Sequence, residues 1–234
     1  DRQLLVEFDV VIEEFLLLPQ ECQAIIANIT KQMGNGMADF VSISARDKYS
    51  IITLQEFDKY CYYVAGLVGI VLYQWEFFLQ KLNILRDFVE DLSEKRRFWP
   101  KEIWHQYVSE IEDLVLIENR QKALNCLSAV VLNTLHHVPD CLSYLAELDD
   151  PGIFSFAATP LAIGYSTLAF TFKNYDSYKK VVKIRKGEGA KLAFRCTSMS
   201  EVAKIFFEYT QVIISKNNDP QDPSFAKIND ICEQ

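Results

Sequence analysis

Helical spacing decides the fold of this chain, and it is clearest in QKLNILRDFVED, residues 80–91. On a helix, polar residues separated by three, four and seven positions share one face, while Leu82, Leu85 and Val89 face elsewhere. The polar face carries Gln80, Asn83, Asp87, Glu90 and Asp91. Because carboxylates within about one turn repel each other, a helix tolerates them only where water or cations relieve the repulsion.

Two interpretations of this polar face are open. In the first, Asp87 and Asp91 bind magnesium, which prefers oxygen ligands and commonly joins one or two carboxylates to substrate phosphates. Gln80 and Asn83 would then bind diphosphate oxygens. In the second, the face is an ordinary solvated charged surface, and spacing alone does not separate the two.

The rest of the 234-residue chain also predicts an all-α protein. Half of its residues are apolar, which is enough for a substantial core, and the two-residue alternation of strands is missing from the sequence. We expect helices over residues 4–18, 20–43, 54–74, 75–92, from 100 onward, 121–148 with a bend at Pro139, 159–172, 198–216 and from 223 to the end. A basic loop is expected over residues 183–189.

The junction between the third and fourth predicted helices is physically odd. Residues 72–76 include no glycine, proline, asparagine or serine that could turn the chain back. Read literally, the sequence predicts one helix over 54–92, longer than the usual globular helix of about 8 to 20 residues. We therefore expect that a connecting loop is missing near residues 74–75.

Composition argues against several classes of protein. A net charge of −8 and a pI near 5.0 argue against nucleic acid as a partner, because its phosphates are bound by clustered cations. Six scattered cysteines without a Cys-x-x-Cys pair predict reduced core residues. The sequence shows neither a signal peptide nor an uninterrupted apolar run of about 18 residues, so we expect this segment to be soluble by itself. No dinucleotide-binding glycine motif, P-loop or hydrolase serine motif occurs in it.

Cations follow the acidic helix and recur later in the chain. Arg96 lies just beyond that helix, within reach of the same diphosphate. Lys183, Arg185 and Lys186 precede Gly187, and such a loop can bind phosphate, arginine as a planar fork and lysine as a point charge. Exposed basic turns are the plainer interpretation of both groups.

Aromatic residues form the third element of the candidate site. Tyr60 and Phe156 lie in apolar segments, and a ring face can stabilise a carbocation without attacking it. Most buried rings simply pack. The three histidines lack metal-ligand spacing, and we assign none of them a catalytic role.

The chain resembles the squalene synthases along nearly its whole length. The segments that carry the resemblance appear in the family's order and are MGNGMAD (33–39), YCYYVAGLVG (60–69), FLQKLNILRDFVED (78–91), FWPKEIW (98–104) and VKIRKG (182–187). The resemblance implies a single all-α isoprenoid synthase domain over residues 1–234, with a central cavity where two farnesyl diphosphates meet. It further implies that this domain lacks the N-terminal part with the first aspartate-rich motif, the loop near 74–75 and the C-terminal membrane anchor.

The resemblance also implies roles for individual residues. It assigns Mg²⁺ to Asp87, Glu90 and Asp91. It assigns diphosphate to Gln80, Asn83, Arg86 and Arg96. It assigns NADPH or diphosphate to Lys183 and Arg185. Tyr60 and Phe156 resemble the family's cavity aromatics, with Tyr60 moving a proton or steadying positive charge.

The implied reaction joins two farnesyl diphosphates through presqualene diphosphate and reduces the product with NADPH to squalene, in sterol biosynthesis. The resemblance places the enzyme at the endoplasmic reticulum membrane with its catalytic domain facing the cytoplasm, held by a segment absent from this sequence. We expect a monomer.

Two alternatives stay open. A phytoene or dehydrosqualene synthase-like enzyme would share the condensation without the NADPH step, and a non-catalytic helical domain would keep the fold and bind isoprenoid or protein partners. Replaced family residues motivate the second alternative. They are Tyr62, Val71, Tyr73, Gln74, Glu76, Leu82, Phe88, Thr159 and Leu161.

Overall fold

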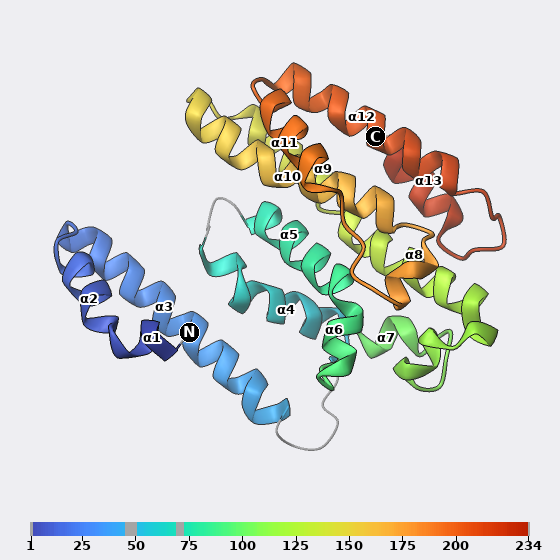
Figure 1. Ribbon diagram of the computed structural model, residues 1–234, viewed down its shortest axis with the longest axis horizontal. Coiled ribbons are helices and arrows are strands. Elements are labelled where there is room, and N and C mark those ends of the chain that lie inside the picture. Colours follow the sequence, from blue (N-terminus) through green and yellow to red (C-terminus); the bar gives the residue numbers. More distant parts are fainter. Residues whose placement is uncertain (1, 45–50, 69–72, 234) are drawn as a thin grey trace.

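The computed structural model describes residues 2–44, 51–68 and 73–233, and its regular elements are helices, as predicted (Figure 1). Three N-terminal helices, α1 (Arg2–Val6), α2 (Phe8–Leu16) and α3 (Gln20–Ser44), project to one side of the remaining bundle. The single helix predicted over 4–18 is therefore two pieces. Glu7 separates them with a φ of −102° and a ψ of 27°, which is not helical geometry.

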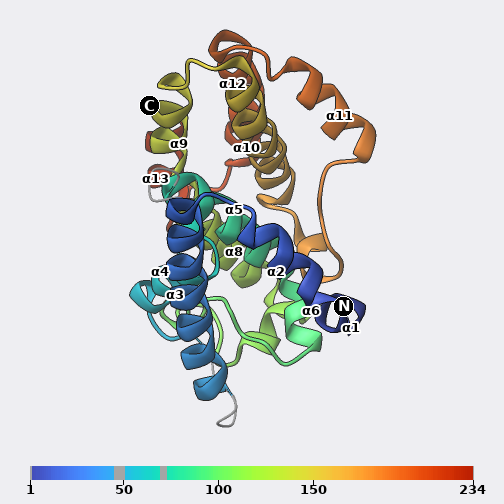
Figure 2. The same ribbon diagram turned by 90° about the vertical axis from the view of Figure 1, so that its left-hand side faces the viewer.

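Helix α3 contacts the bundle through α4 (Leu54–Val64), and Figure 2 shows the two side by side. A glycine makes this approach possible, because a Cβ atom on Gly36 would lie 2.2 Å from the Tyr63 ring. Gly34 has no such neighbour within 4 Å. Of these two glycines of α3, only Gly36 lies at a position that close packing requires.

Helix α4 begins with a capping box in which Thr53 Oγ1 accepts from the Glu56 amide and the Glu56 carboxylate accepts from the Thr53 amide. It is followed by the 3₁₀ turn η1 (Gly66–Val68) and by α5 (Tyr73–Arg86), while residues 69–72 lie outside the described ones. The prediction of a helix over 54–74 is therefore wrong, and so is the literal 54–92 helix. A Cβ atom on Gly66 would lie 3.0 Å from Phe77, so glycine allows the chain to leave α4 beside α5.

The middle of the chain is cut into shorter helices than predicted. It forms α6 (Phe88–Ser93), α7 (Lys101–Trp104), η2 (Ile111–Val115), η3 (Ile117–Asn119), α8 (Arg120–Leu135) and α9 (Val138–Ala146). The predicted 75–92 helix divides at Asp87, and the predicted 121–148 helix divides just before Pro139, which occupies the first turn of α9. Pro100 precedes α7 as predicted, but that helix is only four residues long.

The central helix α10 (Pro151–Thr171) packs against α5, α9, α11 (Lys186–Arg195) and α12 (Met199–Lys216). It begins earlier than the predicted residue 159, because the Asp150 carboxylate caps the amides of Gly152 and Ile153, and Pro160 lies inside it. In the described part of the chain it is the one helix long and apolar enough to span a membrane, but 61% of its apolar window is buried. These contacts identify a core helix.

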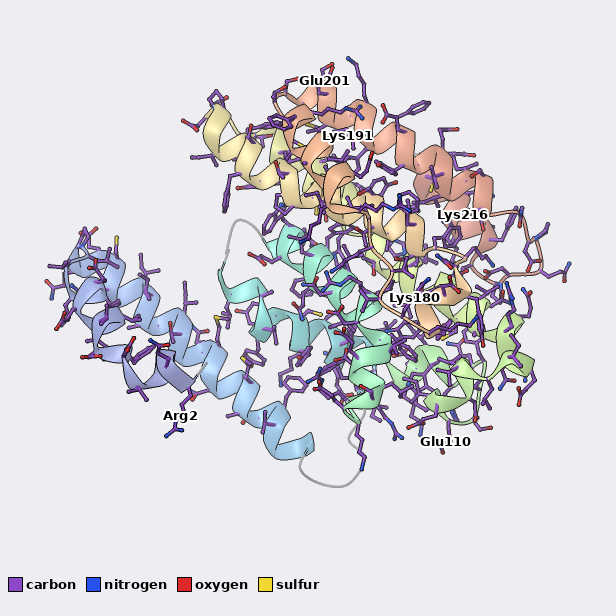
Figure 3. All side chains as sticks on the ribbon, viewed as in Figure 1. Arg2, Glu110, Lys180, Lys191, Glu201 and Lys216 are labelled. Carbon is purple, nitrogen blue, oxygen red and sulfur yellow. The ribbon has the colours of Figure 1, made fainter. Side chains whose placement is uncertain are left out.

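The C-terminal part combines one missed helix with one well-predicted helix. After η4 (Tyr175–Tyr178), α11 begins at Lys186, inside the loop predicted over 183–189. Helix α12 follows Ser198, which caps it as the sequence suggests, and α13 (Phe225–Glu233) closes the chain. Lys216, labelled in Figure 3, donates from Nζ to three carbonyls at the end of α10, at 2.7 to 3.2 Å.

The six cysteines are free thiols, and four of them lie in the core as predicted: Cys61, Cys126, Cys141 and Cys196. Cys22 is exposed on α3, so the core prediction is wrong for it. Burial raises the pKa of the Cys61 thiol to about 12. Such a thiol stays protonated at neutral pH, which fits a packing role.

Candidate functional site

The acidic face predicted from the sequence forms across the junction of α5 and α6. Asp87 lies between the two helices with φ −90° and ψ 11°. Its amide nevertheless donates to the Asn83 carbonyl, and its carbonyl accepts from the Asp91 amide, both at 2.9 Å. Helical bonding therefore continues through the junction, and Gln80, Asn83, Asp87 and Asp91 follow one another about one turn apart.

Burial is graded along this face. The side chain of Asp91 is 12% exposed and that of Asp87 is 28% exposed, whereas Glu90 is exposed. Gln80 and Asn83 are half-buried. The two aspartates are thus drawn toward the body of the protein, and Glu90 is the most solvated of the three acids.

The opposite face of the same helices is fixed in the core. Leu85 and Phe88 are 0% and 3% exposed. The Phe88 ring lies 4.5 Å from the Trp99 ring, and the Trp99 indole donates to the Ile84 carbonyl at 3.3 Å. This packing prevents the carboxylate-bearing helix from rotating about its axis.

Each of these two aspartates is paired with an arginine of its own segment. Arg86 donates from Nε and Nη2 to the two oxygens of Asp87, both at 2.7 Å. Arg96 donates from Nε and Nη2 to Asp91 Oδ1 at 3.0 and 2.9 Å, and it also pairs with Glu94. Burial raises the pKa of Asp91, and the hydrogen bond from Arg96 offsets only part of that effect.

Tyr60 joins this cluster from α4. Its ring stacks on Phe98 at 4.9 Å and meets the edge of Phe40 at 5.2 Å. Burial, with smaller contributions from Cys61 and Asp91, raises the pKa of its phenol to about 12. At neutral pH the hydroxyl therefore keeps its proton.

Lys81, which sequence analysis did not single out, is a buried lysine that holds the helix of the acidic face in place. Lys81 is 1% exposed, and its Nζ lies 2.7 Å from Asp58 Oδ1 and 2.8 Å from Asn133 Oδ1. The rings of Phe57 and Phe77 flank it at 5.4 and 5.7 Å. It ties α5 to α4 and α8. The signal in the sequence is a cation that shares a helix face with apolar residues four positions away on either side.

The basic segment 183–186 leaves η4, and η4 packs against α6. Lys180, labelled in Figure 3, lies between η4 and this segment. Lys183 and Arg185 are exposed, and neither forms an ion pair with another described residue. Both cations are therefore available to an anion.

Phe156 lies on α10 and is 77% exposed, whereas its neighbour Phe154 is 5% exposed. The two rings therefore differ in role. Phe154 packs in the core, and Phe156 offers its ring to a ligand or to another protein segment.

The acidic face carries the oxygen ligands that magnesium prefers, although its carboxylates do not converge on one point. Among residues 2–44, 51–68 and 73–233, no three histidine, cysteine or acidic side chains converge as a metal-binding group. Magnesium, however, commonly takes one or two protein carboxylates and completes its octahedron with water and substrate phosphates. Asp87 and Asp91, one turn apart and both partly desolvated, supply such a pair, so the donor set fits the ion.

Comparison with known proteins gives consistent results. The squalene/phytoene synthase family model matches residues 1–74 and 77–186. The squalene synthase of Schizosaccharomyces pombe is 43% identical over 254 aligned positions, covering 99% of this chain and 55% of that protein. The squalene synthase of Homo sapiens is 39% identical, with 99% and 59% covered. The chain thus spans little more than half the length of these relatives.

A solved structure described as a complex of TcSQS with the ligand E5700 superposes on this fold with a TM-score of 0.92, at 31% identity, covering 99% of this chain and 72% of that one. The family match is interrupted at residues 75–76, beside the junction that lacks turn residues. The alignment with the S. pombe protein also runs over more positions than the 234 residues of this chain. The chain belongs to the squalene/phytoene synthase family.

Proposed function

We propose that this chain is the larger part of the catalytic domain of a squalene synthase. The enzyme would join two farnesyl diphosphates through presqualene diphosphate and reduce the product with NADPH to squalene, in sterol biosynthesis. The observation that carries the proposal is the face on which Asp87 and Asp91 lie one turn apart with Arg86 and Arg96 beside them. The names of the relatives support the same assignment.

The acidic face would hold magnesium through Asp87 and Asp91, with the more exposed Glu90 as a third ligand. When bound, the ion would neutralise charge on the departing diphosphate. Gln80 and Asn83, half-buried on the same face, would donate amide hydrogens to diphosphate oxygens.

The guanidinium groups of Arg86 and Arg96 would stabilise the negative charge that develops as diphosphate leaves the first farnesyl group. Preorganised charged donors of this kind act mainly on the transition state. Tyr60, which keeps its proton at neutral pH, would donate toward the same oxygens, while its ring and that of Phe156 steady the allylic cation. An apolar wall would keep water from that cation.

Lys183 and Arg185 would bind the phosphates of NADPH or a substrate diphosphate. Their exposure and their lack of acidic partners among the described residues support this role. Arginine supplies a planar fork and lysine a point charge, a combination suited to phosphate groups.

The decisive experiment measures diphosphate release and isoprenoid products from farnesyl diphosphate and Mg²⁺ by the intact protein, with and without NADPH. We expect squalene with NADPH and presqualene diphosphate without it. Asp87→Ala and Asp91→Ala should each abolish turnover with little loss of helicity. Asp230→Ala, an exposed helical acid on α13, is the matched control and should keep wild-type turnover.

Other outcomes favour the alternatives. A C30 or C40 product whose yield does not depend on NADPH would favour a dehydrosqualene or phytoene synthase-like enzyme. Two of the replaced family residues lie on helices that carry candidate site residues. They are Leu82, which is buried on α5, and Thr159, which is half-buried on α10. Absence of diphosphate release from farnesyl diphosphate and Mg²⁺ by the intact protein would favour a non-catalytic binding domain.

We also propose that the intact protein adds three parts to the single domain of residues 1–234. These are an upstream part with a first aspartate-rich motif, a loop near 74–75 and a membrane anchor, and the greater length of the relatives supports them. The protein would be a monomer at the endoplasmic reticulum membrane, with its catalytic domain facing the cytoplasm. Cell fractionation with protease protection and size-exclusion chromatography test these points.

A further inference from the structure

The two aspartates of the acidic face are already neutralised by cations of the chain itself. Arg86 covers both oxygens of Asp87 at 2.7 Å, and Arg96 covers Oδ1 of Asp91 at 2.9 and 3.0 Å. A metal ion at these carboxylates competes with the guanidinium groups, because like charges repel and both draw on the same carboxylate oxygens. The competition is strongest at Asp87, where Arg86 bonds both oxygens, while at Asp91 the bonds from Arg96 go to Oδ1.

Backbone geometry builds both ion pairs. Neighbouring residues on a helix do not face each other, and Arg86 reaches Asp87 only because the backbone departs from ideal helical angles at that junction. Arg96 is returned to Asp91 by Lys95, whose φ of 60° is left-handed. The Arg96 amide bonds to the Asp91 carbonyl at 2.7 Å and the Lys95 amide to the Leu92 carbonyl at 3.1 Å, which together form a Schellman turn.

Arg96 lies on the solvent side of its partner Asp91. The side chain of Arg96 is 46% exposed against 12% for Asp91, while Arg86 and Asp87 are similar at 30% and 28%. The guanidinium of Arg96 can therefore swing outward without leaving water, whereas Asp91 stays in place. In the Arg96–Asp91 pair, the movable partner is therefore the cation.

We propose that Arg86 and Arg96 form a counterion latch, which a divalent cation opens only together with a diphosphate that takes up the released arginines. This inference rests on the proposed function and adds a coupling between its two ligands. The divalent cation alone would leave two guanidinium groups beside two new positive charges. Diphosphate alone would meet arginines whose charge the aspartates already neutralise. When both ligands bind, the divalent cation replaces the arginines at the aspartates, and the diphosphate replaces the aspartates at the arginines.

Such coupling is reciprocal, since each ligand changes the affinity of the protein for the other by the same factor. Binding titrations therefore measure it without turnover. The probes are Mn²⁺, which shares the preference of Mg²⁺ for octahedral oxygen ligands, and inorganic diphosphate. Free Mn²⁺ is followed by electron paramagnetic resonance in titrations of the full chain. Because Mn²⁺ and diphosphate also associate in solution, the comparison is made between variants, for which that association is identical.

We expect diphosphate to tighten Mn²⁺ binding to the wild-type chain by about tenfold, within the usual range of about 5- to 150-fold for coupled sites. Arg96→Gln should bind Mn²⁺ alone about fivefold more tightly than wild type, since the competing cation is gone, and should lose most of the enhancement. Arg86→Gln should behave in the same way. Arg96→Lys, which keeps the charge without the planar fork, should lie between them.

Arg195→Gln is the matched control, because Arg195 makes a bidentate pair with Glu208 at 2.8 Å, between α11 and α12. It should match wild type in both titrations, and thermal melts verify that each variant folds. If Arg96→Gln and Arg86→Gln bind Mn²⁺ no more tightly than Arg195→Gln, the latch is overturned while the metal site stands. If the wild-type chain binds no Mn²⁺ even with diphosphate, the proposed function loses its metal site and the latch is lost with it.

Discussion

Helices α5 and α6 and the N-terminal helices α1–α3 carry the same helical pattern of apolar residues and use it differently. In α5 and α6 that pattern enters the core, where Phe77, Phe78, Leu85 and Phe88 are at most 3% exposed. In α2 no residue is buried, and large apolar side chains are exposed from Val6 to Val41. Periodicity therefore predicts a helix, while burial depends on a partner surface that the pattern does not locate.

Replacing Phe78 by alanine should have the largest effect on stability. The ring is fully buried, and a Cβ atom on Gly164 of α10 would lie 3.0 Å from it, so truncation leaves a cavity between two core helices. We expect a loss of about 3 to 5 kcal/mol in the free energy of unfolding, measured by urea titration. Ile25→Ala, at a position that is 59% exposed, should change it by less than about 0.5 kcal/mol. Equal losses would remove the contrast between the two regions.

Acid should destabilise the core through His137, which packs against Phe77 and bonds to Gln74. Burial and the charge of Lys81 lower its pKa from 6.5 to about 3. The unfolded chain binds this proton more readily, so the stability present above pH 6.5 is lost as the pH falls toward 3. Between pH 7 and 5 we expect a loss of about 2 kcal/mol in wild type that His137→Gln does not show. Parallel pH profiles of the two proteins would contradict the assignment.

The contact between the two regions can be tested at its glycine. Gly36→Ala places a methyl group 2.2 Å from the Tyr63 ring and should cost about 1 to 2 kcal/mol, even after the gain in helix propensity. Gly34→Ala meets no atom within 4 Å and should stabilise α3 by up to about 1 kcal/mol. Chemical denaturation of the pair measures both. Stabilisation by Gly36→Ala would show that α3 does not hold this position against α4.

The smallest effect is expected at the exposed apolar surface. Leu17 is 78% exposed at the end of α2, so Leu17→Gln should change the free energy of unfolding by less than about 0.5 kcal/mol. Calorimetry at several protein concentrations measures this change. A loss above 1 kcal/mol would show that a partner covers the side chain in solution.

Several features of the fold followed from the sequence because local signals fix them. The all-α class and the start of α12 after Ser198 are examples. Errors arose where tertiary contacts override local propensity. The helix predicted from residue 159 begins at Pro151 instead, because Asp150 caps it there, and the loop predicted over 183–189 contains the start of α11 at Lys186. The helix predicted to run to residue 74 ends at Val64, because the chain turns at Gly66, where a Cβ atom would lie 3.0 Å from Phe77.

In the candidate site, too, local signals predicted some features and tertiary contacts determined others. Spacing alone placed Gln80, Asn83, Asp87 and Asp91 along one face, and the structure forms that face. The pairing of Arg86 with Asp87 could not be predicted, because adjacent residues on a regular helix point apart and the pairing depends on the junction geometry. Lys81 was missed because its role depends on Asp58 and Asn133, which lie on other helices.

The left-handed turn at Lys95 has a consequence for which sequence changes the site tolerates. Since this turn sets the return of Arg96 to Asp91, the number of residues between the acid and its arginine matters more than their identity. A one-residue insertion or deletion between positions 91 and 96 would break the register of the pair, whereas glycine at position 95 would fit the same backbone without strain. Among related chains, the length of this loop should therefore vary less than its composition.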